Sequence, residues 1–213
     1  MVGAVGLNST GDLLVFRTGA IVLATGGAGG VYLRTDNAAG LTGDGYVLAY
    51  NAGATLKDME FVQFYPTALG EYGARIWRYE LFLPRGGVLR NSLGEDVLKK
   101  RGFEDVQSIT RDTLTRVIMN EILEGRGAGG ALLADLSALD EEYREKMRPY
   151  LVGQECVEQI RVAPTAHHFM GGIAINKECE TGVPAWYAAG EVCGGIHGAN
   201  RLAGNALTDI FVF

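Results

Sequence analysis

Residues 20–27 read AIVLATGG, a short apolar run that ends in two glycines. Because residues 20–24 are all apolar, a strand built from them would be buried on both faces, as strands of parallel sheets are. The glycines permit a tight turn at which the backbone can approach a ligand closely. The stretch therefore predicts a buried parallel strand followed by a ligand-binding loop, although a purely structural turn gives the same pattern.

The segments on either side have strand, turn and helix signals. Residues 2–7 and 13–17 are β-type runs separated by the turn-forming sequence NSTGD, which predicts a hairpin. Further on, the sequence TGDG precedes a helix over 46–50, and 59–65 predicts a strand that ends before Pro66.

The middle of the chain differs from both ends. From 68 to 163 the charges cluster and amphipathic helices are predicted, one capped by Thr110 and ended by Gly125, another over 140–147 capped by Ser137. After residue 163, short apolar runs that predict strands and end in glycine return, for example the AWYAAG sequence before Glu191. The expected organisation is an α/β or α+β core interrupted by a mainly helical insert, with boundaries at 1–67, 68–163 and 164–213.

Composition excludes several classes of function. The chain has 213 residues, of which 47% are apolar, and this content argues against disorder. A net charge of −6 without a basic stripe argues against a nucleic-acid partner, and no apolar run approaches the ~18 residues needed for membrane insertion. Three cysteines without a CxxC pair predict reduced thiols, as in a cytosolic-type protein, and no metal site.

The sequence HGANRLAGNAL, residues 197–207, has the highest density of ligand-binding signals. Arg201 offers a planar fork suited to a carboxylate, and Asn205 is an expected N-cap that leaves backbone N–H groups free for an anion. The sequence PTAHHFMGG begins at Pro164, and of its neighbouring histidines at most one faces a given site. Glu191, after a predicted strand, can accept hydrogen bonds from ribose or ribityl hydroxyls. A structural loop with a surface arginine remains the alternative for 197–207.

These motifs occur in a characteristic order along the chain. The order resembles that of the flavoprotein subunits of fumarate reductases and succinate dehydrogenases, a superfamily that includes the L-aspartate oxidases. The run HGANRL is the most specific part of the resemblance, and its spacing from Glu191 is most similar to that of soluble fumarate reductases. The motifs that carry the resemblance are ATGG, TGDG, MEFVQF, Arg111-Asp112, PTAHHFMGG, Gly190-Glu191 and HGANRL.

The resemblance implies an FAD-dependent enzyme acting on CH–CH groups, whose FAD-binding domain is interrupted by a capping domain. Hydride passes between flavin N5 and the C=C bond of an enoate, and Arg111 transfers the proton. His167 and Arg201 bind a substrate carboxylate. The implied partners are a small carboxylic acid, fumarate or another 2-enoate, and an electron-transfer protein. The implied FAD contacts are Thr25, Gly26, Gly27, Asp44, Glu191, Asn205, Ala206 and Leu207.

The chain departs from the family pattern in one half of the substrate site. Tyr65 stands where the family has a substrate histidine, and Tyr79 stands where it has a threonine before the matching Glu80. Leu83 replaces an arginine of the family's proton relay, and Arg85 is nearby at a different spacing. A tyrosine can bind a carboxylate, but its ring also suits an aryl, alkyl or carbonyl tail. The sequence thus favours the reaction class over fumarate itself.

Two other interpretations stay open. One is an oxidase of amino acids or other α-substituted acids that passes electrons to oxygen. The other is a non-catalytic component or fragment. No GxGxxG unit is present, so we expect the chain to be a piece of a longer protein that binds FAD weakly and is inactive when isolated.

Overall fold

A computed structural model of the chain describes residues 2–70, 72–73, 75–150 and 158–213. The chain divides into two compact units, which are described separately below. Unit 1 contains the residues up to Val31, then Ala38–Gln63 and His168–Phe213, whereas unit 2 contains Tyr32–Asn37 and Phe64–His167. Both units mix helices and strands, which confirms the predicted mixed α/β class.

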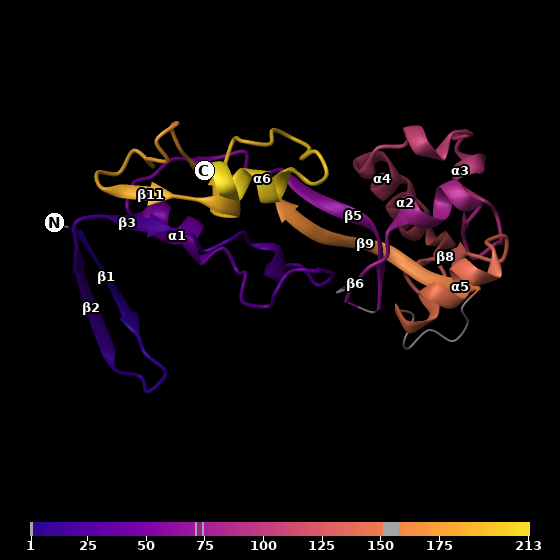
Figure 1. Ribbon diagram of the computed structural model, residues 1–213, viewed down its shortest axis with the longest axis horizontal. Helices are drawn as coiled ribbons and strands as arrows, with labels where there is room; N and C mark the ends of the chain where they lie inside the picture. The colour runs from indigo at the N-terminus through magenta and orange to yellow at the C-terminus, as the bar shows by residue number, and fades with distance from the viewer. Residues whose placement is uncertain (1, 71, 74, 151–157) are drawn as a thin grey trace. The chain divides into compact units, whose positions relative to one another are not determined.

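Unit 1 is built around two strands that are distant in sequence. β3 (Ile21–Leu23) pairs in parallel with β11 (Trp186–Ala188), so that Ala188 lies opposite Leu23 (Figure 1). The predicted parallel strand is confirmed, but its predicted burial on both faces is wrong. Val22 is 63% exposed, so one face of β3 is open to solvent.

A second small sheet and two helices complete the centre of unit 1. β10 is the middle strand of this sheet, parallel to β12 and antiparallel to β4. A Cβ on Gly171, just before β10, would collide with the backbone of Asp58 and Met59, so this close approach requires glycine. The elements are β4 (Leu56–Lys57), β10 (Gly172–Ala174), β12 (Cys193–Gly194), α1 (Asp44–Asn51) and α6 (Asn205–Val212).

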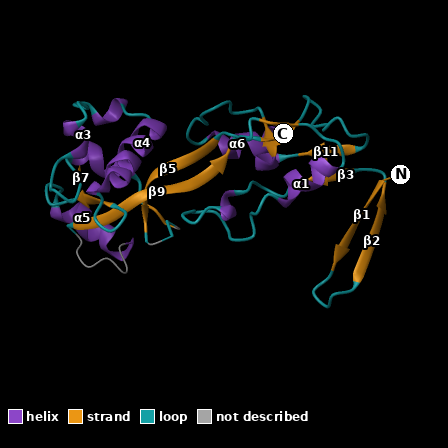
Figure 2. Ribbon diagram, turned by 180° about the vertical axis from the view of Figure 1, so that it is seen from behind, coloured by secondary structure: helices purple, strands orange, loops and turns teal. Residues whose placement is uncertain are grey.

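The predicted hairpin is confirmed as β1 (Val2–Leu7) and β2 (Leu13–Thr18), which are antiparallel throughout (Figure 2). The turn is held by Asn8, whose side-chain oxygen accepts hydrogen bonds from the backbone N–H groups of Thr10 and Asp12.

Unit 2 contains a five-stranded sheet in the order β6-β5-β9-β8-β7. Its core is formed by apolar side chains from the strands and the helices, with Leu114 and Ile118 of α4 fully buried. The strands are β5 (Val62–Leu69), β6 (Arg75–Ile76), β7 (Val88–Arg90), β8 (Leu132–Asp135) and β9 (Gln159–Phe169). The helices are α2 (Tyr79–Phe82), α3 (Val97–Lys100), α4 (Arg111–Glu121) and α5 (Glu141–Met147).

Several predicted boundaries are wrong for local reasons. β5 continues through Pro66 because its pairing with β6 begins two residues later, at Ala68, so on that side the ring removes no donor. α5 is capped by Asp140, whose carboxylate accepts from the Tyr143 N–H, and not by Ser137. The Ser137 hydroxyl instead donates to Asp135.

Within the described part of the chain, no helix is long and apolar enough to cross a membrane, and no cluster of side chains could hold a metal ion. Cys179 and Cys193 are free thiols, and burial raises the pKa of Cys193 to about 12. Cys156 lies outside the described residues.

Candidate active site

The carboxyl ends of β3 and β11 bring two predicted ligand-binding turns together in unit 1. Gly26-Gly27 follow β3, and Glu191 follows β11 within a short 3₁₀ turn. A Cβ on Gly27 would collide with the Glu191 carboxylate, so the two turns are in contact. Ligands of α/β proteins bind beyond the carboxyl ends of parallel strands, which makes this edge a candidate cofactor site.

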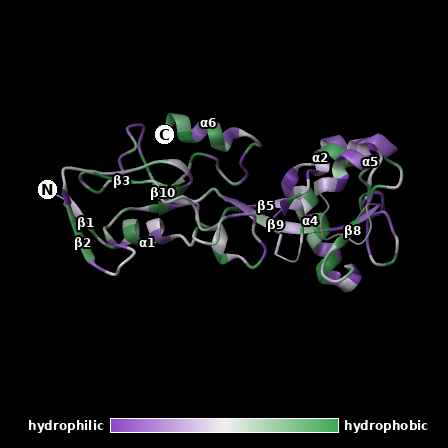
Figure 3. Ribbon diagram, turned by 60° about the horizontal axis from the view of Figure 1, so that its bottom comes forward, coloured by the Kyte–Doolittle hydropathy of each residue, from purple (hydrophilic) through white to green (hydrophobic). Residues whose placement is uncertain are grey.

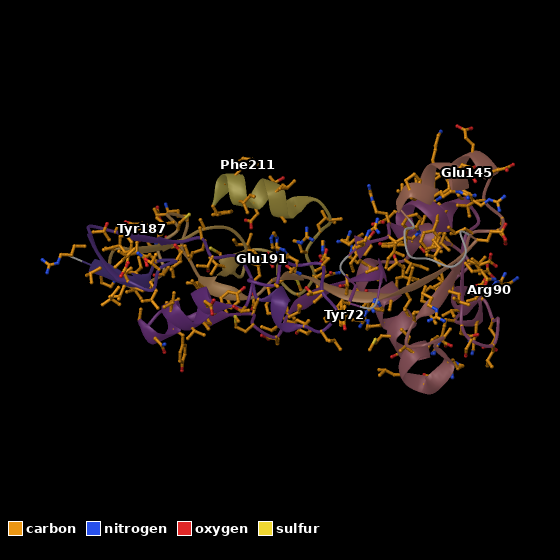
Figure 4. All side chains as sticks on the ribbon, turned by 90° about the horizontal axis from the view of Figure 1, so that it is seen from below. Tyr72, Arg90, Glu145, Tyr187, Glu191 and Phe211 are labelled. Carbon is orange, nitrogen blue, oxygen red and sulfur yellow. The ribbon has the colours of Figure 1, made fainter. Side chains whose placement is uncertain are left out.

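Glu191 is fixed by contacts to the end of β9. Its Oε1 accepts a 2.8 Å hydrogen bond from the Phe169 N–H and lies 3.6 Å from His168 Nδ1. The Glu191 side chain, labelled in Figure 4, has 20% of its surface accessible. It is therefore held in one orientation while part of it can meet a ligand.

Helix α1 adds a third predicted contact. Asp44 is its first residue and is exposed, and its Oδ2 accepts a hydrogen bond of 3.1 Å from the Thr42 hydroxyl. The next residue, Gly45, packs so closely on Thr25 that a Cβ would overlap the Thr25 hydroxyl. The start of α1 and the turn after β3 are thus adjacent in unit 1.

The loop before α6 holds Arg201 in place through its backbone. Arg201 is only 7% exposed, and its carbonyl accepts a 2.7 Å hydrogen bond from the Gln63 amide. The same amide donates to the Asn200 side chain at 3.0 Å. Further along the loop, His197 Nε2 lies 3.4 Å from the buried Asp209 of α6.

Asn205 is not the N-cap that we predicted. The helix begins at Asn205, and the preceding Gly204 adopts φ 88°, a left-handed conformation that glycine takes without strain. Among the residues that the structure describes, no side chain caps the first turn of α6. The N–H groups near Ala206 and Leu207 are therefore left uncapped, as the predicted cofactor contact requires.

The apolar residues of α6, green in Figure 3 and including Phe211 labelled in Figure 4, are mostly exposed.

In unit 2, Arg111 is the first residue of α4, and Thr110 stands at the predicted N-cap position, but its side chain does not cap the helix and its hydroxyl donates to Asp112 instead. The guanidinium lies over the Tyr65 ring, 4.7 Å from its centroid, and its Nη2 is 3.5 Å from Glu80 Oε1. It also hydrogen-bonds with Tyr79. A helix N-terminus disfavours a cation, whereas the carboxylate and the aromatic face stabilise one.

Tyr65 links these groups to each other. Its hydroxyl donates a 2.6 Å hydrogen bond to Glu80 Oε2, and its ring packs on that of Tyr79 at 5.8 Å. Tyr65 is 3% exposed, and burial, followed by the hydrogen bond to Glu80, raises the pKa of its hydroxyl. Tyr65 is therefore a neutral phenol whose only hydroxyl proton is already donated to a carboxylate.

His167 also packs against the Tyr65 ring, with ring centroids 5.7 Å apart. Its Nδ1 is 2.8 Å from Asp36 Oδ2, whereas the neighbouring His168 approaches Glu191 instead. The two histidines thus contact different groups, as their positions on an extended segment predicted. Asp36 was not among the predicted site residues, because nothing in the local sequence marks a contact between residues 131 positions apart.

The structure separates the predicted site residues into two groups. Unit 2 brings together Arg111, Tyr65, Tyr79, Glu80 and His167, and unit 1 holds Arg201 with the predicted cofactor contacts. Leu83 is buried in the unit 2 core. Arg85 does not replace the missing arginine near Glu80, because it donates to Leu81 O and lies over the Tyr143 ring.

Unit 1 has the features that an FAD molecule would need from this part of a protein. The turn at Gly27 brings the backbone after β3 against Glu191, Glu191 offers a fixed acceptor, and the first turn of α6 has uncapped donors. Hydroxyls of a ribityl chain or ribose suit the carboxylate, and the partial negative charge of a flavin edge suits the helix end. The residues present therefore fit the cofactor.

Comparison with known proteins agrees with this fit. Residues 1–207 match the family model described as FAD binding domain. The chain is 46% identical to an uncharacterised FAD-dependent oxidoreductase of Methanocaldococcus jannaschii, and 43% identical to one of the subunits of the fumarate reductase (CoM/CoB) of Methanothermobacter marburgensis. These alignments cover 99% and 100% of the chain but 40% and 41% of the relatives. The chain thus spans about two fifths of their length.

A solved structure of quinol-fumarate reductase with menaquinol molecules matches 99% of the chain and 41% of its own chain, with a TM-score of 0.84 and 36% identity. The described fold is thus that of part of an FAD-binding flavoprotein, as the sequence predicted.

Proposed function

The chain belongs to the FAD binding domain family, and from this premise we propose that the protein carrying it is an FAD-dependent oxidoreductase acting on 2-enoates. It would add a hydride and a proton across the C=C bond of a small carboxylic acid, or remove them in the reverse direction. The relatives support this class, because they include fumarate reductase and succinate dehydrogenase flavoproteins.

FAD would be held in unit 1. The proposed contacts are the backbone at Gly26 and Gly27, the Glu191 carboxylate, and the open first turn of α6, where N–H groups would meet negative charge. When bound, the flavin supplies or accepts a hydride at N5. The remaining proposed contacts are Thr25, Asp44, Asn205, Ala206 and Leu207.

Arg111 would transfer the proton. Reduction needs H⁺ at one alkene carbon and hydride at the other, so the C=C bond becomes a C–C single bond with two new C–H bonds. The Tyr65 ring face and the Glu80 carboxylate hold the Arg111 guanidinium in place, and both attract it in its charged state. The place of Arg111 as the first residue of α4 fixes the backbone from which the guanidinium projects.

Glu80 would return a proton to Arg111 after each turnover. Its Oε1 is 3.5 Å from Arg111 Nη2, and 33% of its side-chain surface is exposed, so it can exchange protons with water. This short route compensates for the absence of the family's relay arginine, whose position is Leu83.

Arg201 and His167 would bind the substrate carboxylate. A charged, planar donor such as Arg201 suits a carboxylate, and both groups stabilise negative charge that develops on it as hydride arrives. Unit 2 would be the capping domain, which we propose to span about 68–163 within a core formed by 1–67 and 164–213.

The observation that carries the proposal is the network of Arg111, Glu80 and Tyr65 at the start of α4, within a chain of the FAD binding domain family. The test uses the whole protein that carries this chain, with reduced methyl viologen in place of its electron donor. We expect a 2-enoate to oxidise two viologen radicals per C=C bond consumed.

The panel of acceptors includes fumarate, crotonate and cinnamate, which differ in the group opposite the carboxylate. If none of these acceptors oxidises the reduced viologen, and the protein forms peroxide from an amino acid in air, the proposal is contradicted and the protein is an oxidase. Flavin-containing protein without either activity indicates a non-catalytic component.

A further inference from the structure

The contact between His167 and Asp36 has no role in the reaction described so far. Asp36 lies in the short segment 32–37, which belongs to unit 2 although it is distant from the rest of that unit in sequence. The Asp36 backbone N–H donates to Ala166 O at 3.2 Å, and Thr35 forms a parallel β-bridge with Ala166. The segment is therefore fixed to β9 directly beside His167.

The Asp36 side chain is equally restrained. Its Oδ1 accepts a 3.3 Å hydrogen bond from the Asn37 amide, which also donates to Ala166 O at 3.0 Å. Only 14% of the Asp36 side-chain surface is exposed. Its Oδ2 is thus directed at His167 Nδ1, 2.8 Å away, with little freedom to move.

An ionised carboxylate can only accept hydrogen bonds, so the hydrogen between these two atoms belongs to His167 Nδ1. A neutral imidazole carries one N–H. With that hydrogen committed to Asp36, Nε2 of the neutral ring is a bare acceptor and would repel a carboxylate. His167 can donate from Nε2 only as the imidazolium.

The other groups around the ring do not change this conclusion. From β5, Tyr65 presents a neutral ring, and its hydroxyl is donated to Glu80. Arg111 packs on that same ring, so Tyr65 contacts both Arg111 and His167. His168 on β9 contacts Glu191. Within the described part of the chain, Asp36 is the charged group that pairs with the His167 ring.

We propose that Asp36 is a positioning residue that makes His167 a proton-dependent binding group for the substrate carboxylate. The proposal rests on the proposed function for the identity of that ligand. Asp36 orients the ring through Nδ1, and a ring that donates from both nitrogens bridges Asp36 and the substrate. At a pH where a free imidazole is neutral, substrate binding is therefore coupled to the uptake of one proton.

The first experiment tests the pair itself by ¹⁵N NMR of the histidine-labelled protein at pH 8, without substrate. We expect a His167 signal with Nδ1 protonated, and its loss or conversion in Asp36→Asn. Glu145→Gln, an exposed carboxylate on α5 (Figure 4), is the charge control and leaves the signal unchanged. A wild-type His167 protonated at Nε2 alone overturns the proposal.

The second experiment measures binding of crotonate to the oxidised holoprotein, in which no hydride is available to reduce it. Calorimetry at pH 8 in two buffers of different ionisation enthalpy gives the number of protons taken up. We expect close to one proton for the wild type and for Glu145→Gln, and close to none for Asp36→Asn. We also expect affinity to fall by about 10- to 150-fold in Asp36→Asn, since a charged hydrogen bond is lost.

The two experiments separate the possible failures. Equal proton uptake in the wild type and Asp36→Asn contradicts the role of Asp36. Absence of crotonate binding, with the NMR signal as expected, contradicts the proposed function and leaves the Asp36–His167 pair established.

Discussion

Arg111 and His167 both pack against one phenol ring, and each is paired with a carboxylate of its own. Glu80 stabilises Arg111 and Asp36 holds His167, while Tyr65 packs against both. This arrangement keeps two positively charged or proton-bearing groups in fixed positions within unit 2. It also keeps the phenol neutral, because burial raises the pKa of Tyr65.

The Tyr65 hydroxyl donates to Glu80, so we propose that Tyr65 presents its ring and not a free donor on the substrate side. If Tyr65 and Tyr79 exclude a second carboxylate, Tyr65→His, alone or with Tyr79→Thr, raises kcat/KM for fumarate relative to crotonate. Steady-state kinetics on both substrates measures the ratio. Wild-type protein that reduces fumarate as well as the double variant does contradicts this role of the tyrosines.

Arg201 is expected to act mainly in binding. We expect Arg201→Ala to raise KM strongly and also to lower kcat, because the guanidinium holds the carboxylate in both the ground state and the transition state. A lost hydrogen bond between charged groups corresponds to about 10- to 150-fold in kcat/KM. Kinetics with the best enoate of the panel measures this, and an unchanged KM argues against carboxylate binding by Arg201.

At the scale of elements, α4 must keep its N-terminus in place for Arg111 to act, and a buried carboxylate anchors its other end. Glu121 is fully buried at the last turn. Arg126 donates to it at 2.6 and 2.9 Å, Arg101 at 2.8 Å, and Asn91 at 3.1 Å. These donors, Arg126 first, lower the pKa of Glu121 well below its ordinary value of 4.5.

We expect Glu121→Gln to lower the free energy of unfolding by about 3 kcal/mol, because it removes the charge that pairs two guanidinium groups. The contribution is fully present above pH 4.5 and is lost as the pH falls through the folded-state pKa, so the difference from wild type shrinks in acid. Urea unfolding at pH 7 and pH 3 measures it.

The control for this prediction is Glu124→Gln, which contacts the same arginines at an exposed position. Its expected effect is below about 1 kcal/mol, since exposed ion pairs contribute little. Equal effects of the two variants contradict the anchoring role of Glu121.

Local patterns along the chain predicted the elements that depend on neighbouring residues. The β1–β2 hairpin, the parallel strand β3 and the start of α4 after Thr110 were all recognisable from local residue patterns, although the Thr110 side chain does not cap α4. The start of α6 was not, because a left-handed Gly204 replaces side-chain capping by Asn205. The Asp36–His167 contact was also beyond local reasoning, because it joins segments 131 residues apart.

At the scale of the whole molecule, the proposed function divides the work between the two units. The proposed FAD contacts, such as Gly27 and Glu191, lie in unit 1, whereas Arg111 lies in unit 2. A change at Arg111 should therefore affect the substrate reaction without affecting the cofactor. This separation is the central claim of the proposed mechanism.

Replacing Arg111 tests that claim most directly. In the whole protein, Arg111→Gln and Arg111→Lys should abolish enoate-dependent oxidation of reduced methyl viologen, while FAD content and flavin reduction by the dye stay near wild type. Lysine keeps the charge but loses the planar fork and the reach. An Arg111→Gln protein that reduces the enoate at a rate near that of the wild type would contradict the assignment of Arg111 as proton donor.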